Sequence, residues 1–151
     1  MTELKLQEDL RKYLCLRCAG FLEQVTHVIL TSYLVQKSSG PILEFSKSSF
    51  IYAPNLRVNP FISLIGRFGN EKKSAFEKFL NSNRRDILSD LLEVRNDVAH
   101  GKMHGGRKLD PARYVAICEE VYDWLVENFL GDSVEVLNEE GKTVGYSNIG
   151  R

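Results

Sequence analysis

The feature that most constrains the fold is the run of residues 3–36, in which large apolar side chains recur at helical spacing. Their positions differ by three, four or sums of these numbers, and they are Leu10, Leu14, Phe21, Val25, Val28 and Tyr33. This period places side chains on one face of an α-helix. We therefore predict one long helix that buries the face carrying these side chains.

A second stripe of the same helix is polar or small and consists of Arg17, Gly20, Gln24, His27 and Thr31. One interpretation is a solvated flank, and the other is that Arg17 and His27 line a polar cleft beside the core. The charged and polar residues within residues 13–35 also make this stretch too polar for a membrane span. No membrane partner is expected.

Further helical periods predict helices over residues 60–68, 71–80, 83–100 and 111–130. Asn59 and Asp110 are the expected caps of the first and last of these, each followed by proline at the first helical position. Ser82 or Asn83 is expected to cap the third, and Gly101 to end it. Residues 38–60 are rich in Ser, Pro and Gly and are predicted to form a long loop.

These elements predict an all-α, up-and-down bundle of four to five helices over residues 1–131. Residues 132–151 change character and are expected to form a small β-hairpin or an acidic tail. A chain of 151 residues is long enough for one domain with a real core.

Net charge is zero, but the charges are unevenly distributed. Residues 1–109 hold 17 basic and 11 acidic side chains, whereas residues 110–151 hold 3 and 9. Such asymmetry can accompany nucleic-acid binding. Three cysteines are too few for a disulfide framework and favour a reducing cytoplasm, and no signal peptide is evident at the N-terminus.

The most informative stretch is residues 91–102, where Arg95, Asn96, Asp97 and His100 stand near the end of a predicted helix. Arginine offers a permanently charged fork for phosphate, and histidine exchanges protons near neutral pH. Metal-independent RNA cleavage needs a base for the ribose 2′-hydroxyl and a cation for the phosphate. Surface charges on a helix that ends in a histidine are the competing interpretation.

Helix geometry adds a constraint on this group. Arg95 and His100 would project about 140° apart on a regular helix, whereas Asn96 and His100 share a face. Both Arg95 and His100 reach one phosphate only if the helix loosens at Gly101 or if two chains share the site. The second case predicts a symmetric dimer with the two motifs facing across its axis.

The segment Arg95-Asn96-Asp97-Val98-Ala99-His100-Gly101 resembles the motif of the HEPN superfamily and is similar to the RiboL-PSP type of HEPN domain. The resemblance implies a dimeric, metal-independent endoribonuclease of toxin–antitoxin, abortive-infection or antiviral systems, with Arg95, Asn96 and His100 as catalytic residues. It implies RNA as substrate and an antitoxin or regulatory protein as a further partner. Members without catalysis exist, so a dimerising module that binds RNA or a nucleotide is the alternative.

Basic residues close to the motif are candidates for RNA phosphate binding, namely Arg17, Lys102, His104, Arg107 and Lys108. Two other patterns suggest metal sites less well. Cys15 and Cys18 lack a second pair, and Gly101 is expected to interrupt a helix between His100 and His104. No metal or other cofactor is therefore expected.

Overall fold

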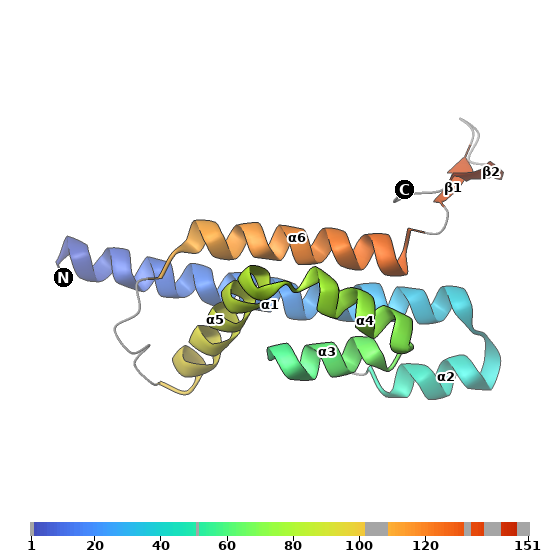
Figure 1. The fold of residues 1–151 in the computed structure, drawn as a ribbon, viewed down its shortest axis with the longest axis horizontal. Coiled ribbons are helices and arrows are strands. Elements are labelled where there is room, and N and C mark those ends of the chain that lie inside the picture. The colour runs from blue at the N-terminus through green and yellow to red at the C-terminus, as the bar shows by residue number, and fades with distance from the viewer. Residues whose placement is uncertain (1, 51, 102–108, 132–133, 138–142, 148–151) are drawn as a thin grey trace.

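A computed structural model describes residues 2–50, 52–101, 109–131, 134–137 and 143–147 of the chain. Within them the backbone forms the helices α1 (Glu3–Lys37), α2 (Gly40–Ser48), α3 (Val58–Gly66), α4 (Asn70–Phe79), α5 (Ser82–Ala99) and α6 (Pro111–Phe129). Two short strands, β1 (Val134–Leu137) and β2 (Thr143–Ser147), pair antiparallel after the last helix. The predicted all-α bundle is confirmed, with six helices described in place of four to five (Figure 1).

The long first helix is confirmed, but the face predicted to be buried is wrong for four of its six residues, while Val25 and Tyr33 do pack against the core. Leu10, Leu14, Phe21 and Val28 are between 42% and 58% exposed. The face that is fully buried in the core instead carries another set of side chains: Cys15, Ala19, Leu22, Thr26, Ile29 and Leu30. Both sets repeat at three and four residues. The period therefore predicts the helix, but only the neighbouring helices decide which stripe they cover.

Helices α1 and α6 lie side by side and run in the same direction (Figure 1). The rings of Phe21 and Tyr122 lie 6.1 Å apart at one point of this contact, and those of Tyr33 and Phe129 lie 5.2 Å apart further along. Helix α5 runs antiparallel to α6. Arg84 near its start bonds to Glu120, whereas the later Asp90 accepts from Tyr114, which precedes Glu120 in α6.

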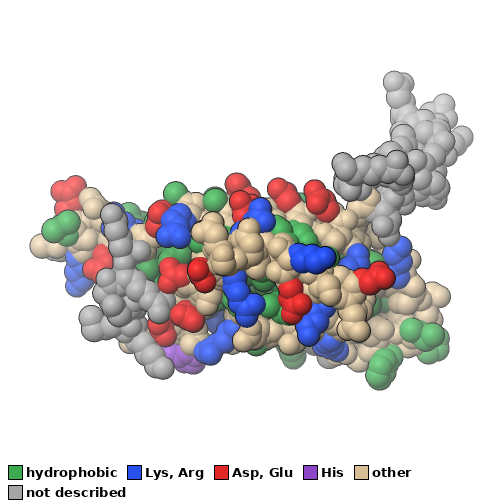
Figure 2. Space-filling model, in the orientation of Figure 1, with side chains coloured by type: hydrophobic (Ala, Val, Ile, Leu, Met, Phe, Trp, Pro, Cys, Tyr) green, Lys and Arg blue, Asp and Glu red, His purple; other side chains and the backbone are tan. Residues whose placement is uncertain are grey.

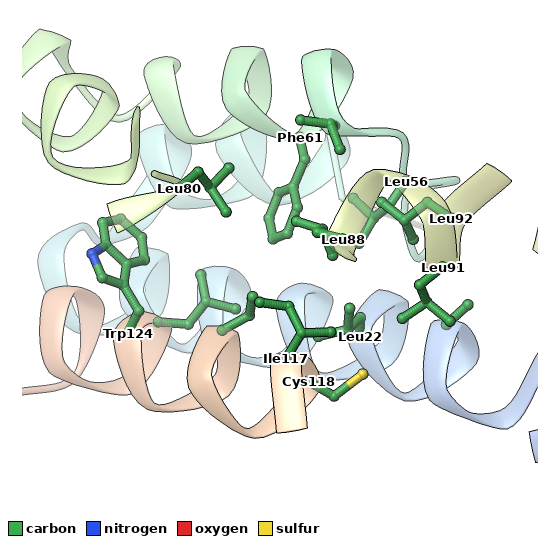
Figure 3. Close-up of a cluster of buried hydrophobic side chains, with 14 of the residues drawn as sticks. Leu22, Leu56, Phe61, Leu80, Leu88, Leu91, Leu92, Ile117, Cys118 and Trp124 are labelled. Carbon is green, nitrogen blue, oxygen red and sulfur yellow. The ribbon is translucent and has the colours of Figure 1, made fainter. Parts of the chain in front are cut away.

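The core fills the space that α1, α5 and α6 enclose with α3 and α4. Figure 3 shows side chains from these elements converging there, among them Leu22, Phe61, Leu88, Leu91, Leu92, Ile117 and Trp124. Fully burying one such side chain contributes roughly 1.5–3 kcal/mol relative to leaving it exposed. This core fixes α5 against α1 and therefore the position of the motif at the end of α5.

Residues 38–60 are not the continuous loop predicted from their composition. Helix α2 occupies Gly40–Ser48, with proline in its first turn, and it buries none of its side chains. Ile42 and Phe45 are 71% and 78% exposed. A helix with no buried face leaves little helical period in the sequence, which explains why composition alone predicted a loop.

The caps of the next helices follow the sequence in part. Asp110 caps α6 as predicted, since its side chain accepts from the backbone N–H of Arg113 at 3.4 Å. Helix α3 begins two residues earlier than predicted, with Arg57 rather than Asn59 as its N-cap. Proline at position 60 therefore stands within the first turn and not at its first residue.

Candidate functional site

The motif stands on the last turns of α5. The helix starts after Asn81, whose side chain accepts from the backbone N–H of Arg84 at 2.9 Å, one residue before the predicted cap. It ends as predicted: the N–H of His100 donates to the carbonyl of Asn96 at 3.1 Å, and Gly101 follows with φ +68°. His100 is therefore an exposed side chain at the very end of a helix.

Arg95 is held by two parts of the chain that are distant in sequence. Its Nη1 donates to Oδ1 of Asn55 at 3.0 Å, and its Nη2 lies 3.2 Å and 3.3 Å from the two carboxylate oxygens of Glu23. The Glu23 side chain is 12% exposed and that of Arg95 is 25% exposed. Partial burial weakens screening by water, so this ion pair fixes the guanidinium against α1.

Glu23 and Asn55 are site residues that the sequence analysis missed. Glu23 lies 72 residues before Arg95, and nothing in a local pattern joins the two. A signal does exist, because Glu23 is a carboxylate within the most apolar stretch of the chain. Charged side chains in such surroundings are seldom buried without a partner. That reasoning predicts a cation opposite Glu23 but does not say which one.

A second contact pins the same part of the chain to α1. The Nε2 of His27 donates to the carbonyl oxygen of Phe50 at 2.5 Å. His27 lies one helical turn after Glu23, so both side chains face the segment between α2 and α3. The structure thus gives His27 a partner in the backbone. It does not bring His27 and Arg17 together as walls of one cleft.

Asn96 and His100 lie one turn apart on α5, with Asn96 half-buried. They share a face of the helix, whereas Arg95 turns away from it toward α1. Among the described residues, no hydrogen bond or ion pair joins Arg95 to His100. One chain therefore presents the two groups in different directions, as the helix geometry predicts.

Of the predicted RNA-binding residues, only Arg17 is described by the structure. It lines a cavity of about 320 Å³ between α1 and α6, together with Leu14, Phe21, Val115 and Glu119 among others. Glu23, which holds Arg95, lies on another face of α1 because six residues turn a helix by about 240° beyond a full turn. Lys102, His104, Arg107 and Lys108 lie outside the described residues.

The cysteines are packed into the bundle rather than placed as reactive groups. Cys118 donates through its Sγ to the carbonyl of Cys18 at 3.5 Å. Burial raises the pKa of Cys15 to about 11 and also raises the pKa of Cys118. Such thiols stay protonated near neutral pH, which makes them poor nucleophiles. Within the described part of the chain, no three His, Cys, Asp or Glu side chains are grouped so that they could hold a metal ion.

No described helix combines the length and the apolarity that a membrane span requires. Comparison with curated proteins and with solved structures gave no match. Comparison with protein families gave a match to the model described as RiboL-PSP-HEPN, which covers residues 2–130. That range includes every helix described above and ends one residue after α6. The chain therefore belongs to the RiboL-PSP-HEPN family.

Proposed function

We propose that this protein is a metal-independent endoribonuclease. His100 acts as general base and removes the proton of a ribose 2′-hydroxyl, whose oxygen then attacks the adjacent phosphorus. The bond from phosphorus to the 5′-oxygen breaks and that oxygen takes up a proton from water, which leaves a cyclic phosphate on one product and a 5′-hydroxyl on the other. Arg95 stabilises the charge that gathers on the phosphate oxygens, and Asn96 lies beside the reacting group.

The observation that supports this most is the way in which Arg95 is held. An arginine used only for solubility would extend into water, whereas Arg95 is half-buried and bonded by Asn55 and Glu23. A positioned guanidinium on the same helix end as an exposed histidine suits phosphate chemistry once a second chain brings the two groups together. The membership in a HEPN family gives this arrangement its RNA-related context.

We place the complete site between two copies of the chain. His100 is exposed at the end of α5, whereas Arg95 points toward α1, so a second copy can supply the missing partner across a two-fold axis. Mixing an Arg95→Ala variant with a His100→Ala variant tests this. With random exchange, about half of the dimers are mixed and each has one intact site, which restores about a quarter of the activity. No recovery on mixing would contradict the shared site.

Cleavage itself is tested with purified protein and single-stranded RNAs of varied sequence in EDTA. We expect the wild type to cut and to leave cyclic phosphate ends, and His100→Ala to be inactive. Arg113→Ala, which removes an exposed arginine of α6, is the matched control for a charge change and should keep full activity. If the wild type cuts no better than His100→Ala, the protein is not this enzyme.

The alternative is a non-catalytic module that dimerises and binds RNA or a nucleotide. One observation favours it, namely that Glu23 already neutralises the guanidinium of Arg95. In that case RNA binding persists in His100→Ala and in the wild type without any product. The same gel and binding measurements on the two proteins distinguish the alternatives.

The biological role that we propose is toxicity or defence in the cytoplasm, with an antitoxin or regulatory protein as partner. The three cysteines of this chain are free thiols in the structure, which suits a reducing compartment. Expression of the wild type and of His100→Ala in growing cells tests this role. Equal growth of the two strains without any partner would count against a toxin.

A further inference from the structure

A cavity of about 420 Å³ lies between the start of α3 and the middle of α5. The side chains that carry its chemistry are Arg57 from the α3 side and Arg85 and Ser89 from α5. These three residues lie outside the motif and have no part in the proposed cleavage step. In Figure 2 several Lys and Arg side chains lie over α3 and α5, with acidic side chains between them.

The cavity has an excess of positive charge. Arg57 and Arg85 contribute two guanidinium groups, and Glu93 is the single carboxylate in its lining. Nη2 of Arg85 donates to Oδ1 of Asn59 at 2.7 Å, which orients its side chain across the opening. Glu93 accepts from the hydroxyl of Ser89 at 3.3 Å. Two arginine forks with most of their N–H groups free of these contacts suit a phosphate group.

This cavity and two residues of the candidate site, Asn96 and His100, lie along one face of α5. Arg85, Ser89, Asn96 and His100 recur at multiples of about one turn, so they project on the same side of the helix. The distance along the axis from Arg85 to Asn96 is about 17 Å at 1.5 Å per residue. This corresponds to about five steps of a stacked strand at ~3.4 Å each.

One short segment of the chain also touches both places. Asn55 accepts from Arg95 at the candidate site, and Arg57, two residues later, lines the cavity. A ligand that lay across this segment would therefore meet Arg95 at one end and Arg57 at the other. The cavity also lies about 17 Å along α5 from Asn96, a span that a nucleic-acid strand can cover and a single nucleotide cannot.

We infer that the cavity between α3 and α5 is a second phosphate subsite, in which Arg57 and Arg85 bind the backbone of an RNA strand about five nucleotides from the cleaved bond. The inference rests on the proposed function for the position of that bond, but it concerns binding and not catalysis. It makes strand length a determinant of affinity. Short oligonucleotides reach only one of the two places.

The test measures binding of fluorescent single-stranded RNA in the His100→Ala background, where no cleavage interferes. The variant Arg57→Ala/Arg85→Ala is compared with Arg11→Ala/Arg113→Ala, which removes two exposed arginines elsewhere and changes the net charge by the same amount. Losing two phosphate contacts should make the negative slope of log K against log salt shallower by about 1.4. It should also weaken binding of long RNA about 25-fold at ~0.1 M salt. Circular dichroism of each variant shows whether the fold is retained.

An oligonucleotide of about three nucleotides should bind both double variants with equal affinity, because it spans only the motif and does not reach the cavity. Equal affinity and salt slope for the two double variants overturn the subsite, and so does a wild type that binds no RNA. A loss that is as large for a free nucleoside monophosphate as for long RNA also overturns it, in favour of a nucleotide pocket.

Cleavage assays of the same double variants, made with His100 intact, separate the two proposals. If the wild type cuts RNA and Arg57→Ala/Arg85→Ala cuts and binds like the control, the subsite fails and the nuclease stands. If long RNA binds through Arg57 and Arg85 but is never cut, the subsite stands and the nuclease fails.

Discussion

Replacing Arg95 by alanine should destabilise the fold as well as remove the proposed activity. The substitution leaves the Glu23 carboxylate, only 12% exposed, without its ion-pair partner. Removing one partner of a fully buried pair costs about 3–5 kcal/mol, whereas an exposed pair contributes about 0–1 kcal/mol. With Arg95 itself 25% exposed, the expected cost lies between these limits, at about 2 kcal/mol. For a chain of this size, that lowers Tm by about 4–8 °C.

Urea unfolding followed by circular dichroism measures this loss, and two further variants give it a specific cause. His100→Ala removes an exposed side chain and should stay within about 0.5 kcal/mol of the wild type. Glu23→Gln combined with Arg95→Ala removes the unpaired charge and should recover about half of the lost stability or more. Equal unfolding midpoints for Arg95→Ala and His100→Ala would refute the reasoning, and so would a double variant no more stable than Arg95→Ala.

Three other measurements follow from the same structure. Burial raises the pKa of Cys15 from 9.0 to about 11, so the unfolded chain loses a proton that the folded chain keeps; unfolding midpoints in urea should be constant below about pH 9 and fall between pH 9 and 11. Thr26 is fully buried and its hydroxyl has no hydrogen-bond partner, so Thr26→Val should raise stability by about 1 kcal/mol in thermal unfolding, and a loss would contradict the packing. Gly101 has φ +68°, so Gly101→Ala should cost about 1 kcal/mol by strain at the turn after His100, seen as a lower Tm.

Local sequence signals predicted the parts of the fold that depend on local physics. The end of α5 at Gly101 and the start of α6 at Asp110 follow from backbone conformation and capping, which involve only neighbouring residues. Helix α2 was missed because it buries no side chain and so leaves no period. What covers a helix cannot be inferred in this way, as the exposed Phe21 and the buried Leu22 of α1 show.

The same distinction between local signals and long-range packing applies to the candidate site. Arg95, Asn96 and His100 form a motif within six residues, so the sequence alone could identify them as candidates. Glu23 and Asn55 could not be found in this way, because they meet Arg95 only through the packing of α5 on α1 and of the segment before α3. The direction of Arg95 away from His100 did follow from sequence, since it depends only on helical geometry.

The partners of Arg95 restrain it without using up its capacity to bind phosphate. A guanidinium has five N–H donors, and the contacts to Asn55 and Glu23 involve only Nη1 and Nη2, leaving Nε and part of each terminal nitrogen for a ligand. Restraint in advance also lowers the entropy lost on binding, since a free arginine side chain carries about 2 kcal/mol of rotamer entropy. The same ion pair nevertheless removes Arg95 as a source of long-range attraction for RNA. Under the proposed function, that attraction comes from cations without a carboxylate on their guanidinium, and Arg57 and Arg85 at the cavity between α3 and α5 are described residues that meet this condition.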